Sequence, residues 1–248
     1  MIYAIGDIHG QLALLEKAHG LISTDKAAHG DASAAVVHLG DLVDRGPDSR
    51  GVIDHLIRGR DRGEDWVVIR GNHDQLFLDF LNGSDGTSDR LRTGVTWQSS
   101  VMGGAATLAS YAPRRRLERA ATYEDRARSA VPLEHKRFLE SLPYWFRSED
   151  YLFVHAGIRP GFPIEAQDEE DLMWIRNDFL WHMGAYENLI VHGHTPVEEP
   201  THYGNRINID CGAGWGNDIV PVVLDGGACF ALTPEGRRPV KAPGEYYQ

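Results

Sequence analysis

The 248-residue sequence has few cysteines, no excess of positive charge and no long apolar segment. Cys211 and Cys229 are its only cysteines, so a disulfide framework is excluded and a reducing cytoplasm is the expected location. Lys and Arg number 25 against 36 Asp and Glu, which gives a formal net charge of −11. This balance excludes a protein that coats nucleic acid, because binding along the phosphate backbone requires an excess of cations.

The sequence also lacks the features of a signal peptide, a membrane span or a linker between domains. Residues 1–5 already have the composition of a strand, which is not typical of a signal peptide. No apolar run reaches the roughly 20 residues that span a bilayer, so we expect no membrane association. No Pro/Gly/Ser-rich stretch or repeat divides the chain, and we predict a single domain over 1–248 with a lid-like helical insertion at about 82–135.

Three stretches in the first third of the chain share one design: an apolar strand, a turn with glycine and an amphipathic helix. Open α/β sheets place their sites at the carboxyl ends of such strands. Asp7 and His9 are two residues apart, which in extended backbone puts both side chains on one side. Isolated surface turns with local salt bridges would explain one such unit but not three. The polar groups in these turns are Asp7, His9, Asp41, Asp44, Arg45, Asn72 and His73.

Five short motifs follow one another in order. They are Gly6-Asp7-x-His9-Gly10, Gly40-Asp41-x-x-Asp44-Arg45-Gly46, Gly71-Asn72-His73-Asp74, His155-Ala156-Gly157 and Gly193-His194-Thr195-Pro196. The set resembles the calcineurin-like metallophosphoesterases, and more narrowly the phosphoprotein phosphatase family in its bacterial and phage form. The resemblance implies an α/β fold, a four-layer sandwich of two mixed β-sheets flanked by helices. It also implies a two-metal centre at one sheet edge.

Metal ligands are carried over by motif. They are Asp7, His9, Asp41, Asn72, His155 and His194. Asp41 would bridge the two ions, the first also held by Asp7 and His9. His192 ends a strand too and is the alternative to His194, but the family's Gly-His-Thr-Pro pattern places the ligand after the glycine. His192 is then expected to support its neighbour.

Such nitrogen and oxygen ligands suit Mn²⁺, Fe or Zn²⁺ rather than Ca²⁺, and we expect two divalent ions with Mn²⁺ as the activating one. Two such ions carry more charge than Asp7, Asp41 and a bridging hydroxide together. A phosphate dianion is therefore attracted locally despite the acidic chain.

His73 resembles the general acid of the family, with Asp44 holding its other nitrogen. Arg45 offers a planar fork for phosphate oxygens. Arg176 matches the second phosphate-binding arginine, although an ordinary surface position is the alternative. The remaining histidines match no motif and are expected to be structural or exposed: His19, His29, His38, His55, His135, His182 and His202.

Three functions fit these motifs. The first is a serine/threonine-type protein phosphatase or broad phosphomonoesterase, in which a metal-bridging hydroxide attacks a phosphorylated protein or small phosphoester in line. The second is a symmetrical bis(5'-nucleosyl)-tetraphosphate hydrolase, which differs in the lid and substrate pocket. The third is a catalytically silent metal-binding interaction module. Asp44 favours the first function, and the complete set of ligands and acid speaks against the third.

Overall fold

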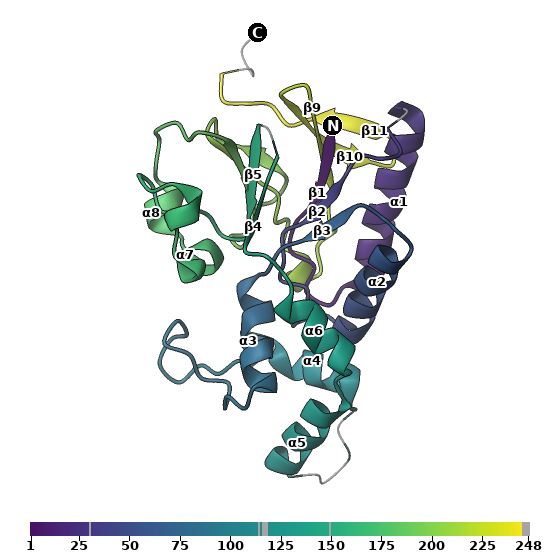
Figure 1. The fold of residues 1–248 in the computed structure, drawn as a ribbon, viewed down its shortest axis with the longest axis vertical. Helices are drawn as coiled ribbons and strands as arrows, with labels where there is room; N and C mark the ends of the chain where they lie inside the picture. The colour runs from purple at the N-terminus through teal and green to yellow at the C-terminus, as the bar shows by residue number, and fades with distance from the viewer. Residues whose placement is uncertain (30, 114, 116–118, 149, 245–248) are drawn as a thin grey trace.

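Two mixed β-sheets form the centre of the molecule, and helices lie on the outer side of each (Figure 1). The structure is a computed structural model that describes residues 1–29, 31–113, 115, 119–148 and 150–244. The first sheet has the strand order β11-β10-β9-β1-β2-β3, and the second has the order β4-β5-β6-β8-β7. This arrangement confirms the α/β sandwich of two mixed sheets flanked by helices.

The first sheet begins with three parallel strands, each followed by a helix, and the chain returns at its end to add three antiparallel strands. Its strands are β1 (Ile2–Ile5), β2 (Val36–His38), β3 (Trp66–Val68), β9 (Val222–Asp225), β10 (Ala228–Thr233) and β11 (Gly236–Pro239). The helices after the first three strands are α1 (Leu12–His29), α2 (Ser49–Asp61) and α3 (Asn72–Leu81).

The second sheet combines three parallel strands with an antiparallel strand at each edge. Its strands are β4 (Trp145–Arg147), β5 (Tyr151–Val154), β6 (Leu189–His192), β7 (Thr201–His202) and β8 (Arg206–Asn208). The other helices are α4 (Gly104–Tyr111), α5 (Ala120–Ala130), α6 (Leu133–Glu140), η1 (Ile164–Ala166), α7 (Glu169–Trp174), α8 (Asn177–Leu180) and η2 (Ala213–Trp215).

Strand β1 shows why the sheets form a sandwich. Tyr3 and Ile5 pack into the core beneath α1 and α2, whereas Ile2 and Ala4 pack between the two sheets, in one cluster with Phe153. All four β1 side chains are buried, as expected of a strand that is covered on both faces. The hydrophobic effect therefore holds the second sheet against the first.

The parallel pairing brings the functional turns together. Ile5, His38 and Val68 are register partners at the carboxyl ends of β1, β2 and β3. Strands β5 and β6 are likewise parallel, with Phe153 opposite Val191. Turns that follow these strands consequently gather at one edge of the sandwich.

Residues 82–135 pack partly into the main core. Trp97 is fully buried, with its ring 5.6 Å from that of Phe77 and 5.0 Å from that of Phe80 on α3. Helix α4 packs against α2 and α5, and Leu108 and Tyr111 of α4 belong to the same hydrophobic cluster as Phe77. This segment therefore lies where it can support the functional turns.

Within the described residues, no helix combines the length and apolar character needed to cross a membrane. The two cysteines, Cys211 and Cys229, are buried and unpaired. Burial raises the pKa of both thiols to about 12, which leaves them protonated and unreactive at neutral pH.

Three histidines that match no motif form a hydrogen-bonded chain between α1, β2 and α2. His38 Nδ1 lies 3.0 Å from the Val67 carbonyl oxygen, and its Nε2 lies 2.9 Å from His19 Nε2. His19 Nδ1 in turn lies 2.9 Å from His55 Nε2. A carbonyl only accepts, so His38 must donate from Nδ1, and each neutral ring then supplies one donor and one acceptor. The chain is satisfied when all three rings are neutral.

This chain predicts a loss of stability in acid. Burial lowers the pKa of His38 to about 4, whereas an unfolded histidine titrates at about 6.5. The unfolded state therefore binds the proton more strongly, so stability is complete above about pH 6.5 and falls as the pH drops toward 4. At pH 5 the contribution of His38 to this loss is about 2 kcal/mol.

Urea denaturation of metal-free protein at pH 7.5 and pH 5 measures this loss. In His38→Gln, which retains a donor for Val67, the difference between the two free energies of unfolding should shrink by about 2 kcal/mol. An unchanged difference would show that His38 does not carry the effect.

Candidate metal centre

Backbone strain is concentrated at the functional turns. Among the described residues, the non-glycine positions with positive φ are His9 (48°), Asp41 (49°), Asp44 (76°), Arg45 (66°) and His194 (65°). Each such position costs about 1–3 kcal/mol and persists only where the surroundings impose it. All five belong to the motifs that the sequence identifies.

The glycines of the motifs allow two turns to meet at their backbones. A Cβ at Gly40, whose φ is +88°, would lie 2.3 Å from the Gly71 amide nitrogen. A Cβ at Gly71 would lie 2.2 Å from Asp41 Oδ1. Any larger residue at either position would push the turn with Asp41 away from the turn with Asn72.

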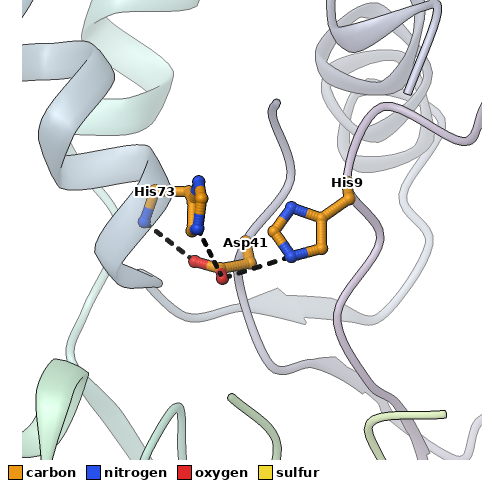
Figure 2. Close-up of side chains that lie close together, drawn as sticks. All are labelled: His9, Asp41 and His73. Carbon is orange, nitrogen blue, oxygen red and sulfur yellow. Dashed lines mark hydrogen bonds and ion pairs between the residues drawn. The ribbon is translucent and has the colours of Figure 1, made fainter. Parts of the chain in front are cut away.

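Asp41 is the meeting point of the turns (Figure 2). Its carboxylate is 2% exposed and accepts a hydrogen bond of 2.9 Å from the backbone amide of His73. Nε2 of His9 and Nε2 of His155 each lie 3.5 Å from one of its oxygens. Burial raises the pKa of Asp41, but the surrounding imidazoles of His155, His73 and His9 outweigh it and lower the pKa below its usual range.

Asn72 joins the group on the side of the second sheet. Its Oδ1 lies 2.9 Å from His155 Nε2 and 2.9 Å from His194 Nδ1. Asp41, His155 and His194 are close enough together to hold one ion. The structure thus brings Asp41, Asn72, His155 and His194 into one cluster.

The tautomers of two imidazoles are fixed in the form that binds metals. His9 donates from Nδ1 to the Val43 carbonyl at 2.9 Å, and His155 donates from Nδ1 to the Leu39 carbonyl at 2.8 Å. Burial lowers the pKa of both rings and that of His194, which keeps them neutral. The Nε2 lone pairs of His9 and His155 therefore point to the centre, as in metal sites whose ligand tautomer is set by a backbone carbonyl.

Buried carboxylates also indicate a cation site. Asp7, Asp41 and Asp210 are almost inaccessible to solvent. The pKa of Asp7 is raised well above its usual range by burial and by the charges of Asp210 and Asp41. Divalent cations would neutralise these carboxylates, so the residues present fit a metal centre.

His73 also lies near Asp41 and His9, with Nε2 4.0 Å from Asp41 Oδ2. Its Nδ1 donates to Asp44 at 2.6 Å. Burial lowers the pKa of His73, but the charge of Asp41 and the hydrogen bond to Asp44 outweigh it and raise the pKa. A histidine that favours its protonated form is a poor ligand and a good proton donor. Asp7, with Oδ2 3.9 Å from His9 Nε2, is the better ligand on this side.

Asp44 is held by His73, as the motifs lead us to expect, and by two further groups that no motif marks. It is fully buried and accepts from His73 Nδ1 at 2.6 Å, from Trp97 Nε1 at 2.7 Å and from Thr107 Oγ1 at 2.6 Å. Trp97 and Thr107 come from the segment at 82–135 and follow no motif, so no local signal marks them. The segment predicted as a lid thus orients the carboxylate behind His73.

Two arginines face the centre. Arg45 Nη1 lies 2.6 Å from His9 Nε2, and its Nη2 lies 3.2 Å from His73 Nε2. Arg176 lines the same cavity and donates to Thr195 Oγ1 at 3.2 Å. Both guanidinium groups therefore border the cavity that Asp41 lines.

Comparison with known proteins agrees with this geometry. A family profile described as calcineurin-like phosphoesterase matches residues 1–220. The chain belongs to this family. Its members are metallophosphoesterases, so the site is that of a phosphoester hydrolase that uses divalent metals.

Relatives in this family include two named activities. The asymmetrical bis(5'-nucleosyl)-tetraphosphatase PrpE of Anoxybacillus flavithermus is 27% identical, over 88% of this chain and 89% of the relative. Serine/threonine-protein phosphatase 1 of Salmonella typhimurium is 28% identical, over 88% of this chain and 89% of the relative. A solved cold-active protein-tyrosine phosphatase of a Shewanella species has the same fold, with a TM-score of 0.64 and 16% identity over 97% of this chain and 80% of that one.

His192, the alternative to His194, lies outside the calcineurin-like centre. Its Nε2 accepts from Arg206 Nη1 at 3.2 Å, and its ring meets that of Phe179 edge-on at 5.0 Å. The left-handed φ of His194 turns the chain after β6, so that His194 and not His192 joins Asn72.

Two details of the centre differ from the sequence analysis. His9 has a φ of 48°, so Asp7 and His9 converge through a left-handed turn and not through extended backbone. Asp210 belongs to none of the five motifs, although it lies two residues after β8 and lines the cavity. Burial raises its pKa to about 6, and the charge of Asp41 adds to this. Its place just beyond a strand end was the signal that could have revealed it.

Asp41→Asn should prevent the binding of a pair of metal ions, because the amide removes the charge shared by both halves of the centre. Purified protein loaded with Mn²⁺ and freed of excess ion should hold two ions per wild-type chain and at most one per variant, as counted by plasma mass spectrometry. Asp218→Asn, an exposed carboxylate paired with Lys17, is the matched control. Two ions in Asp41→Asn would contradict the bridging role.

Proposed function

We propose that the protein hydrolyses phosphate monoesters in the manner of a serine/threonine-type protein phosphatase. The observation that carries this proposal is the buried pair of Asp44 and His73, whose 2.6 Å hydrogen bond leaves His73 Nε2 facing Arg45 and the cavity. A monoester of an aliphatic alcohol has a poor leaving group, which needs such a proton donor.

The proposal assigns two divalent metal ions to the centre, with Mn²⁺ as the activating ion and Fe or Zn²⁺ compatible with the same ligands. When bound, a pair of such ions lowers the pKa of a shared water and polarises the phosphoryl oxygens. The ligands proposed are Asp7, His9, Asp41, Asn72, His155 and His194. The two unpaired cysteines agree with the reducing cytoplasm that we propose as its location.

The side chains around the phosphate have separate tasks. Arg45 and Arg176 bind its oxygens and orient it for in-line attack by water. His73 gives the proton from Nε2 to the departing alkoxide oxygen. Asp44 stabilises the protonated ring through Nδ1, and the hydrogen bonds from Trp97 and Thr107 keep Asp44 in place.

Hydrolysis of dinucleoside tetraphosphates is the second candidate function. It is favoured by the names of the PrpE relatives, and by a cavity of about 760 Å³ lined by four arginines, which exceeds the needs of one phosphate. The sequence motifs fit a symmetrical hydrolase, whereas the names of these relatives specify asymmetrical cleavage. A silent metal-binding module is the least supported, because the residues that we propose as ligands and acid lie close together around Asp41, with Arg45 beside them.

A panel of three substrates distinguishes these functions. Metal-free protein, with and without Mn²⁺, should hydrolyse p-nitrophenyl phosphate and a phosphoserine peptide only when the ion is present. Cleavage of diadenosine tetraphosphate alone would overturn the phosphatase proposal in favour of the second function. Bound metal without any turnover would support the silent module.

His73→Asn should slow turnover of alkyl phosphates by roughly 10²–10⁴-fold, because the alkoxide then leaves without a proton. The loss on p-nitrophenyl phosphate should be much smaller, since nitrophenolate is a good leaving group. Trp97→Phe keeps the buried ring and removes only the donor to Asp44, so it should show the same pattern more weakly. Equal losses on both substrates would remove His73 from the acid role.

A further inference from the structure

The cavity beside the metal centre has an outer part that binding of a single phosphate does not explain. Its inner wall is formed by the proposed ligands with Arg45 and Arg176. The outer wall comes from the segment between α3 and α4, which adds Arg90, Leu91 and Arg92. A volume of about 760 Å³ is that of a pocket for a ligand far larger than phosphate.

The segment that forms the outer wall is fixed at three points. Arg90 pairs with Glu170 on α7, its Nε donating at 2.9 Å. The Trp97 amide donates to the Gly86 carbonyl at 2.7 Å, which closes the loop on itself. The Arg45 amide donates to the Gly103 carbonyl at 3.2 Å, which ties the loop to the phosphate-binding turn. The wall is therefore a positioned surface of the site.

The charged residues of the outer wall, Arg90 and Arg92, are both positive. The acidic residues that line the cavity, Asp7, Asp41 and Asp210, all lie at its metal end. The pair with Glu170 offsets the charge of Arg90. The side chain of Arg92 is exposed, and its guanidinium has no hydrogen bond or ion pair with any of residues 1–29, 31–113, 115, 119–148 and 150–244. In a chain with a net charge of −11, an uncompensated guanidinium at the rim of an active site marks a place for an anion.

We propose that Arg92 binds a second phosphoryl group of the substrate, on the leaving-group side of the cleaved phosphate. This assignment rests on the proposed phosphoesterase function and names a specificity-determining residue for it. The first phosphate occupies Arg45 and Arg176, so Arg92 distinguishes substrates by what lies beyond the scissile bond. A polyphosphate chain or a doubly phosphorylated peptide can supply the second group.

Calorimetry of Mn²⁺-loaded protein with inorganic phosphate and with tripolyphosphate tests the proposal, with each anion titrated into Mn²⁺ alone as a blank. Wild-type protein should bind tripolyphosphate more tightly than phosphate. Arg92→Gln should lose about tenfold in affinity for tripolyphosphate and nothing for phosphate, because only the longer anion reaches it. Arg62→Gln, an exposed arginine at the end of α2, is the matched control and should bind both anions as wild type does.

Two results would overturn the proposal. One is wild-type affinity for tripolyphosphate that is no greater than for phosphate. The other is an Arg92→Gln variant that loses affinity for both anions equally or for neither. The calorimetry does not depend on turnover. Absence of activity on every substrate would therefore contradict the hydrolase function alone. The binding of tripolyphosphate by Arg92 would still be tested by the calorimetry.

Turnover identifies the source of the second group. The kcat/KM of Arg92→Gln should be unchanged with p-nitrophenyl phosphate, which has one phosphate. A fall of about tenfold confined to diadenosine tetraphosphate assigns the site to a polyphosphate chain, and a fall confined to a peptide with two phosphoserines assigns it to a phosphoprotein. Equal kcat/KM to wild type on both would contradict a role for Arg92 in selection.

Discussion

The carboxylate of Asp41 is the charge on which the site depends. It is buried where three turns meet, with imidazoles of His9 and His155 at 3.5 Å and the amide of His73 at 2.9 Å. A buried carboxylate is tolerated only where opposite charge and hydrogen bonds replace its water. Asp41 itself has a left-handed and therefore strained backbone conformation, which brings these partners together.

The packing of the sandwich offsets this backbone strain, because apolar contacts on both faces of the first sheet fix the strand ends. The segment between α3 and α4 lines the cavity and also contacts the buried carboxylate of Asp44. The Trp97 ring is stacked on that of Phe77 and tilted against that of Phe80, and the same indole donates to Asp44. One buried side chain thus couples the hydrophobic core to the group that orients His73.

The local charge of the cavity also differs from that of the chain as a whole, since arginines line it in an acidic protein.

Much of the fold and of the candidate site could be predicted from the sequence. Apolar runs that end in glycine and an ionisable residue are local patterns, so the first three strand–turn–helix units could be recognised without contacts. Parallel strands must then align their carboxyl ends, which is why Asp7, Asp41 and Asn72 were expected to meet. The choice of His194 over His192 followed from the family's motif, and the structure supplies its physical basis in the left-handed turn after β6.

The sequence alone therefore determined the class of fold and the residue types at the strand ends, because both follow from short-range pattern. Only the tertiary structure decided which distant groups complete the site. Trp97 and Thr107 lie 53 and 63 residues from Asp44, and Asp210 meets Asp7 across nearly the whole chain. The hydrogen-bonded chain of His19, His38 and His55 could not be predicted from the sequence for the same reason. Contacts between remote segments depend on how helices and sheets pack, and no local pattern records that packing.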